Sequence, residues 1–238
     1  MLSCSHVRNL TGVIVLNSSL EVEAIEHLLA LASPRPDWRM LDLAQGEMSI
    51  APPFSSHVRQ IAVLAREMAI ASDPDGSVCA DAHRMPFAAN SFDVVILHGS
   101  VYPRVDMVID QVGDVLKSRG LFMILTDLMP ENAHAARYIQ AFERLCDPRK
   151  DKLFAEYEWR GMCLNAGMIV DSVEITCRRT MLIPWAKRYG CDEVAIERLQ
   201  IMLAQAPDAV QAFWQPGCVG TLDAAFDQYR LLLMCRKP

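Results

Sequence analysis

The sequence predicts an α/β fold: a doubly wound, mainly parallel sheet with a helical cap. Two observations lead to this prediction. Short apolar runs alternate with helix-prone segments as far as residue 127, and the pattern becomes mostly helical beyond it. With 238 residues, 52% of them hydrophobic, the chain can bury a core without help from a metal or a disulfide. We therefore expect one domain over 1–238.

The first half supplies a helix and five strands. Residues 20–33 place apolar side chains at helical spacing, and Pro34 and Pro36 then end the helix. An amphipathic helix is expected at 105–117. The strands are expected at the short apolar runs 38–44, 60–64, 76–80, 92–97 and 121–126. Strands that alternate with helices in this way are typical of parallel sheets.

The second half reads as a cap with two strands. Residues 131–146, 151–165 and 191–213 have helical character. Residues 168–177 alternate like a strand, and 228–235 are apolar enough to form a last one. Because no repeat or flexible linker separates these segments, we interpret them as part of the same domain.

Charge and apolar run length exclude several partners. The net charge is −6, and the longest basic runs are dipeptides such as Arg178-Arg179, which argues against nucleic acid or an anionic membrane. Apolar runs reach only about five residues, whereas a membrane span needs roughly 18. The run 13–16 is too short for a signal peptide. The sequence predicts a cytoplasmic protein without a transmembrane helix.

The eight cysteines are widely spaced, never closer than 14 residues to one another. This spacing contains no pattern typical of metal ligands, so we expect no metal. In a cytosolic protein such cysteines are expected to be reduced thiols in the core.

Residues 78–127 contain an ordered series of motifs. Asp81 precedes Met-Pro-Phe at 85–87, Ser-Phe-Asp follows at 91–93, and Val-Leu-Lys-x-x-Gly at 115–120. This block resembles the class I S-adenosylmethionine (SAM)-dependent methyltransferases, in particular the ubiquinone and menaquinone C-methyltransferase group (methyltransferase type 11). Further matches, in order along the chain, lie at 158–159, 165–167 and 236–238.

The resemblance implies SAM as cofactor and a seven-stranded sheet whose last strand is antiparallel. It also implies a division of the single domain. Residues 20–127 would form a cofactor-binding core, 128–222 a helical cap with strand six, and 226–238 the last strand and C-terminus.

The cofactor motif is degenerate. Where the family has Gly-x-Gly-x-Gly after the first strand, residues 44–48 keep only Gly46. Where the family has a ribose-binding carboxylate, 21 residues after Asp42, the chain has Val63, and Leu64 and Ala65 are also apolar. Such a carboxylate contributes roughly 1.5–3 kcal/mol through charge-assisted hydrogen bonds. We therefore expect weak binding of SAM, or its loss.

Three further features of this loop also indicate weak binding of SAM. Met48 puts a side chain where the family has only a hydrogen, and Glu47 adds a negative charge near a helix N-terminus that normally receives a carboxylate. Pro52-Pro53 disturbs the first turns of the following helix. The loop is expected to be remodelled.

The resemblance and the order of the strands nominate the site residues. Asp81 either contacts the adenine amino group or caps the following turn. His98 follows strand four, at the edge where open α/β sheets bind ligands, and is either an acid or base or a partner for a loop carbonyl. Either His98 or Tyr102 would orient or deprotonate the acceptor. His83 is expected to be an exposed loop residue. The cofactor-binding candidates are Asp42, Ala44, Gly46, Val63, Asp81, Ala82, His98 and Gly99.

Arg104 and Asp127 are further candidates near substrate or cofactor, with a purely structural role as the alternative. Aromatic and methionine side chains of the cap either line an apolar pocket or, taken singly, pack in the core. They are Tyr138, Phe142, Phe154, Tyr157, Trp159, Met162, Trp185, Tyr189, Phe213 and Trp214.

The function expected first is SAM-dependent methylation of a small, largely apolar acceptor at carbon or oxygen. One alternative is an enzyme of this fold that no longer methylates and instead catalyses cyclisation or isomerisation. Another is a non-catalytic partner subunit. A small-molecule substrate is expected, and a homo-oligomer or protein partner is left open.

Overall fold

The structure, a computed structural model, describes residues 13–15, 20–45, 54–65, 77–99, 102–148, 150 and 152–238. Its sheet has eight strands in the order β1-β7-β8-β6-β5-β2-β3-β4. The strands are β1 (Val13–Val15), β2 (Arg39–Gln45), β3 (Gln60–Ala65), β4 (Ser77–Cys79), β5 (Phe92–Gly99), β6 (Leu116–Asp127), β7 (Ile169–Met181) and β8 (Ala225–Arg236). The helices are α1 (Leu20–Ala32), the short 3₁₀ turn η2 (Ala82–Arg84), α3 (Val105–Val115), α4 (Ala133–Cys146), α5 (Glu156–Asn165), α6 (Leu182–Arg188), α7 (Glu193–Ala204) and α8 (Asp208–Trp214).

Strand directions confirm the predicted fold class. Strands β2 to β6 pair in parallel, and β8 runs antiparallel to both of its neighbours, β6 and β7. The seven expected strands are all present. An additional short strand, β1, pairs in parallel with β7 at the edge of the sheet.

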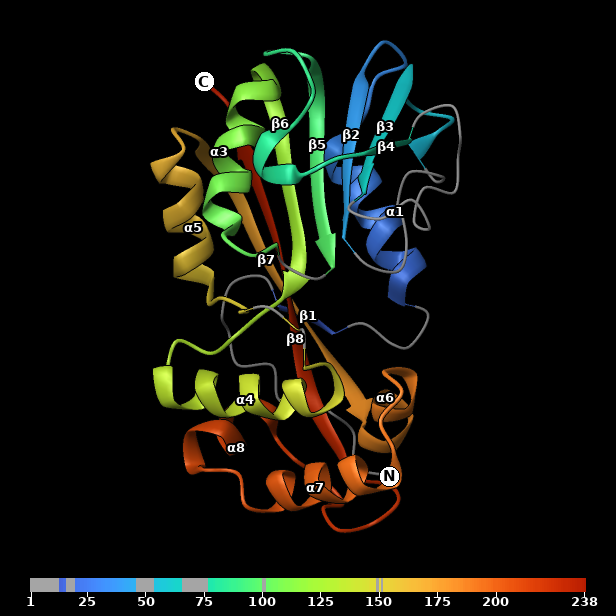
Figure 1. The fold of residues 1–238 in the computed structure, drawn as a ribbon, viewed down its shortest axis with the longest axis vertical. Helices are drawn as coiled ribbons and strands as arrows, with labels where there is room; N and C mark the ends of the chain where they lie inside the picture. Colours follow the sequence, from blue (N-terminus) through green and yellow to red (C-terminus); the bar gives the residue numbers. More distant parts are fainter. Residues whose placement is uncertain are drawn as a thin grey trace.

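Alternation along the strands divides the core between the two faces of the sheet. Leu41 and Leu43 belong to a larger core that includes the apolar stripe of α3. Met40 lies on the opposite face with Leu28 of α1. Because successive side chains of a strand point to opposite faces, both faces are apolar and each needs a covering helix. Figure 1 shows α3 and α5 on one side of the sheet and α1 on the other.

The cap consists of α4, α6, α7 and α8, gathered at the end of the molecule that β7 and β8 reach (Figure 1). Its interior is aromatic: the ring of Phe142 lies 4.6 Å from Trp214 and 5.5 Å from Trp185, between ring centroids. These three side chains and Trp159 are buried. Core packing, the alternative to a pocket lining, is thus confirmed for them, whereas Tyr157 is 55% exposed.

Several element boundaries differ from the sequence-based expectation. The helical segment 191–213 is two helices, with Pro207 at the start of α8. Helix α5 begins at Glu156, where the backbone N–H of Ala155 donates to the Glu158 carboxylate at 2.9 Å. Strand β7 continues to Met181 because β8 pairs with it over its whole length.

The cysteines require a correction. Cys146, at the end of α4, and Cys191, after α6, form a disulfide, so the expectation of reduced thiols is wrong for this pair. Cys79 and Cys218 are exposed and are not core thiols, Cys177 is partly buried, and Cys163 and Cys235 are buried. The spacing of cysteines along a sequence does not show which of them meet in space. Cys4 lies outside the described residues.

Across the described ranges, no helix combines the length and the apolar character that crossing a bilayer requires.

Candidate active site

A buried carboxylate and a histidine meet at the carboxyl edge of the parallel strands. Asp42 on β2 is 0% exposed. His98, near the end of the neighbouring strand β5, has its Nε2 atom 3.1 Å from Asp42 Oδ1. The pairing register places the Cα of His98 opposite Ala44, two residues beyond Asp42. Because these strands are parallel, their carboxyl ends reach one edge and both side chains gather there.

Tyr102 brings a phenol to the same place. It lies in the segment between β5 and α3, is 4% exposed, and its hydroxyl has no hydrogen-bond partner among the described residues. Burial raises the pKa of Tyr102 well above its ordinary value, and the carboxylates of Asp42 and Asp81 raise it further. The phenol therefore stays protonated. A buried hydroxyl without a partner is a donor to which a ligand atom can bind.

Asp81 and His83 join the two loops that border this site. The Asp81 carboxylate caps η2 by accepting the backbone N–H of His83 at 3.0 Å, and it lies 2.6 Å from His83 Nδ1. The other ring nitrogen of His83 contacts the carbonyl oxygen of Pro103. His83 is therefore held between η2 and the segment after β5, with 24% of its side chain exposed, and is not the exposed loop residue that was expected. The hydrogen bond that the His83 ring donates to the Asp81 carboxylate, and then the one to the Pro103 carbonyl, raise the pKa of His83.

Asp81 caps the turn η2, which is one of the two roles that the sequence predicts for it. Its side chain is still 69% exposed, so the carboxylate also remains accessible to a ligand.

The remaining candidates occupy the same edge. Val63 on β3 is buried, and its Cα pairs with Asp42. Ala82 is buried in η2, and Gly99 ends β5 with a φ of 78°, a left-handed conformation that favours glycine. The Cα of Ala44 pairs with Ala65, the last residue of β3. Gly46, Glu47, Met48 and Pro52-Pro53 lie outside the described residues.

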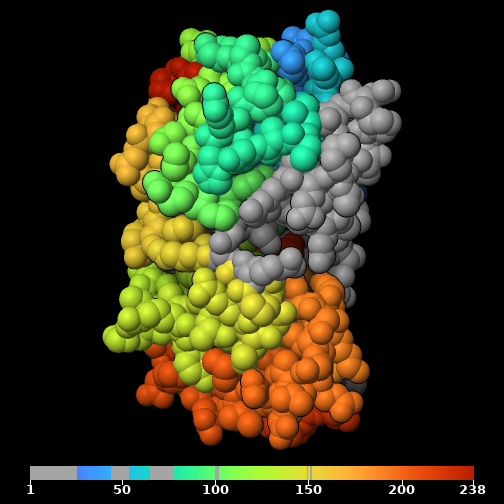
Figure 2. Space-filling view, viewed as in Figure 1, coloured from blue at the N-terminus to red at the C-terminus, as the bar shows by residue number. Residues whose placement is uncertain are grey.

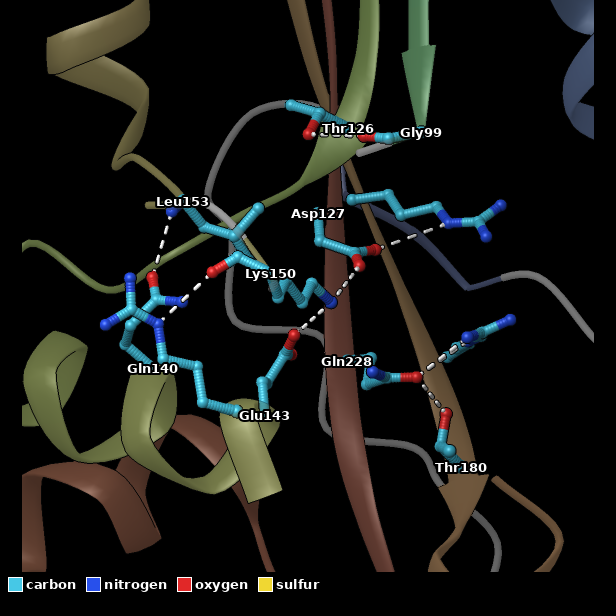
Figure 3. A network of polar contacts seen from close by, with 12 residues as sticks. Gly99, Thr126, Asp127, Gln140, Glu143, Lys150, Leu153, Thr180 and Gln228 are labelled. Atoms are coloured by element: carbon cyan, nitrogen blue, oxygen red, sulfur yellow. Dashed lines mark hydrogen bonds and ion pairs between the residues drawn. The ribbon is translucent and has the colours of Figure 1, made fainter. Parts of the chain in front are cut away.

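A second polar cluster lies beyond the end of β6, toward the cap (Figure 3). Asp127 lies 3.7 Å from Lys150 Nζ and 3.7 Å from Arg230 Nε. Lys150 also forms an ion pair with Glu143 of α4. Burial lowers the pKa of Lys150, but the carboxylates of Glu143 and Asp127 outweigh burial and raise it overall. Lys150 is therefore a fixed cation.

Thr126 connects the two clusters, because its hydroxyl donates to the carbonyl oxygen of Gly99 at 3.3 Å (Figure 3). Of this second cluster, sequence reasoning singled out only Asp127, at a strand end. The pairing of Lys150 with Glu143 and the position of Arg230 depend on how the cap packs against the sheet. No local sequence pattern around these three residues predicts that packing.

Comparisons with known proteins relate the chain to a family and to a fold. Residues 41–124 match a family described as Methyltransferase domain, a range that runs from β2 into β6 and contains Asp42, Asp81, His98 and Tyr102. A curated relative, the uncharacterized protein YafE of Escherichia coli (strain K12), is 24% identical over 135 residues, which are 56% of this chain. The match spans 65% of the length of that relative.

Solved structures share the fold. YcgJ from Bacillus subtilis superposes with a TM-score of 0.82 at 18% identity, over 91% of this chain and 98% of its own. The [4+2]-cyclase SpnF superposes with a TM-score of 0.59 at 15% identity, over 96% and 88% of the two chains. The chain thus has the fold of the class I SAM-dependent methyltransferases, and its residues 41–124 match the methyltransferase domain family.

Proposed function

We propose that the protein is a SAM-dependent methyltransferase that acts at a carbon or oxygen atom of a small molecule. The observation that carries this proposal is the hydroxyl of Tyr102, which is buried, has no partner among the described residues, and lies under the influence of the Asp42 and Asp81 carboxylates. SAM presents hydroxyl and amino groups together with positive charge. A site with two carboxylates and one orphaned donor fits such a ligand.

The cofactor would be held along the strand edge. Asp81 supplies an acceptor, Ala82 and Gly99 supply close backbone, and Asp42, Ala44, Gly46 and Val63 complete the candidate set. Strand β3 has no carboxylate at any position from Gln60 to Ala65. We therefore expect the affinity for SAM to be about tenfold to a hundredfold lower than at a site that has the ribose-binding carboxylate.

His98 would take the proton from the acceptor. When bound, SAM supplies an electrophilic methyl group. The Nε2 atom of His98 faces Asp42, which leaves Nδ1 to accept the proton, and Asp42 then stabilises the imidazolium as an ion pair. Tyr102, held protonated by burial, donates a hydrogen bond and positions the bound molecules.

The test is calorimetry with SAM and with its demethylated product on the wild type and on Tyr102→Phe. This substitution removes only the hydroxyl, and we expect it to weaken binding about tenfold. The matched control is Tyr138→Phe, because the Tyr138 hydroxyl donates to the Met202 carbonyl within the cap at 2.7 Å. Equal affinities for the wild type and both variants would contradict the role of Tyr102.

A second reading, an enzyme of this fold that no longer methylates, is motivated by the absence of a carboxylate on β3. Wild-type protein that binds neither SAM nor its product at millimolar concentration, yet retains another small molecule on purification, would favour it over methyl transfer.

A further inference from the structure

The cluster beside Asp127 has more positive than negative charge. We define the basic cluster as Lys150, Arg178 and Arg230. Among the described residues, the carboxylates that form ion pairs with this cluster are Asp127 and Glu143. Glu143 forms an ion pair with Lys150, and both side chains are about nine-tenths buried. Asp127 lies 3.7 Å from Lys150 and 3.7 Å from Arg230, so one carboxylate faces two cations.

Arg178 is held by a neutral side chain. Its Nη2 and Nε atoms donate to Gln228 Oε1 at 2.7 and 3.2 Å, and the same oxygen accepts from Thr180 at 2.9 Å. Within the described part of the chain, no carboxylate lies at ion-pair distance from Arg178. Burial lowers the pKa of Arg178 and the charges of Arg230 and Arg188 lower it further, while the Asp127 carboxylate opposes these effects only in part. A half-buried guanidinium held only by a neutral amide, near other cations, is costly unless an anion neutralises it.

The strand register puts these groups on one face. On β8, Gln228 pairs with Arg178 of β7, and Arg230 pairs with Asp127 of β6. Two residues beyond Arg230, Leu232 lies in the core that contains Ile96 of β5. Side chains two apart on a strand share a face, so Arg230 and Gln228 extend the face on which Ile96 and then His98 lie.

The same face leads to the candidate site. The hydrogen bond from Thr126 to Gly99 joins the residue before Asp127 to the residue after His98. Figure 2 shows the cap, in yellow-green and orange, below the green and blue residues of the core. The basic cluster therefore lies on the face that carries His98, with Asp127 two residues further along β6 than Leu125, the partner of His98.

We propose that the acceptor carries a carboxylate or phosphate group that binds between Arg178 and Arg230. Guanidinium groups bind both anions through paired, charge-assisted hydrogen bonds. In this arrangement the anion neutralises the surplus charge and fixes one end of the acceptor, while its reacting atom points toward His98. The inference that the bound molecule is a methyl acceptor rests on the proposed function. The anion site itself can be tested without SAM.

The experiment measures the melting temperature and calorimetric binding with sodium phosphate and with sodium acetate, each against sodium chloride at equal ionic strength. Wild-type protein should be stabilised by at least one of the two anions beyond the chloride effect, and the better ligand identifies the group. Arg178→Gln and Arg230→Gln should each weaken this binding about tenfold or more. Arg160→Gln, which breaks the exposed i,i+4 pair with Glu156, is the matched control and should bind the anion like the wild type.

A readout without ligand separates a binding role from a structural one. Because no described carboxylate lies at ion-pair distance from Arg178, and Arg230 and Arg188 lower its pKa, Arg178→Gln should leave the melting temperature in chloride unchanged or raise it. An anion effect no greater than that of chloride, or an Arg178→Gln variant that still binds as the wild type does, would overturn the proposal. If Arg178→Gln melts lower, Arg178→Lys and Arg230→Gln decide: retention of full anion binding by both would also overturn it.

A last arm addresses SAM itself, which also has a carboxylate. Phosphate should bind equally well in the presence and absence of SAM. Direct competition would assign the cluster to the cofactor and refute an acceptor subsite. Failure of SAM to bind, with phosphate binding intact, would count against the proposed function alone.

Discussion

The imidazole of His98 lies against a fully buried carboxylate, with His98 Nε2 at 3.1 Å from Asp42 Oδ1 across the β2–β5 pair. This contact joins the first and fourth strands that the sequence predicts. It places a carboxylate beside the imidazole, as a counter-charge when the ring takes up a proton. A histidine so placed is suited to general acid–base chemistry.

His98→Ala should therefore lower the turnover of folded protein by about 10²–10⁴-fold, because a positioned base contributes that much to proton transfer. The pH–rate profile of the variant should lack the limb that the wild type shows. His83→Ala is the control and should retain most of the activity, since both nitrogens of His83 are engaged by Asp81 and Pro103. Full activity of His98→Ala on the identified acceptor would refute the assignment and make Tyr102 the next residue to test.

The register of β3 indicates where a ribose-binding carboxylate could be restored. Ala65 is the last residue of the strand, whereas Val63 pairs with the buried Asp42. Ala65→Asp should raise SAM affinity about tenfold in calorimetry, because it places an acceptor at the ligand edge. Val63→Asp should instead lower the free energy of unfolding in urea by roughly 2–4 kcal/mol, because it buries a second carboxylate beside Asp42. A gain of affinity from Val63→Asp and none from Ala65→Asp would show that this interpretation of the register is wrong.

Local patterns predicted the fold well. Each expected strand of the parallel half is present, because buried strands are continuous apolar runs that need no knowledge of their partners. Strand β1 was missed: three residues form a strand only because β7 lies beside them, some 160 residues away in the chain. The extension of β7 to Met181 depends in the same way on β8.

The site was predicted only in part. Asp42, Asp81, His98 and Tyr102 follow strands or motifs and could be named from the sequence. The contacts among them could not, because these depend on strand register. Arg178 was visible only as half of a basic dipeptide, and its separation from acidic partners is a property of the folded chain.

The pKa of His83 predicts a pH effect on stability. Its pKa is raised in the folded state, first by the Asp81 hydrogen bond and then by the Pro103 carbonyl. The protonated imidazole is therefore favoured by folding. This contribution is fully present below the unfolded value of 6.5 and is lost as the pH rises through the higher folded value. The melting temperature of the wild type should fall more between pH 6 and about 8 than that of His83→Asn. Parallel pH profiles for the two proteins would contradict the tie between η2 and the segment after β5.

The disulfide between Cys146 and Cys191 should stabilise the cap. It links residues 45 apart in sequence, and a closed loop of that size restricts the unfolded chain by about 2–4 kcal/mol. Cys146→Ser should lower the free energy of unfolding by that amount. A reductant should lower the free energy of unfolding of the wild type to the same value and leave that of the variant unchanged. Cys218→Ser, at an exposed cysteine, is the matched control and should behave like the wild type. Thiol titration of the denatured protein checks the bond directly: an equal number of reactive thiols with and without prior reduction would show that the pair is not joined in solution.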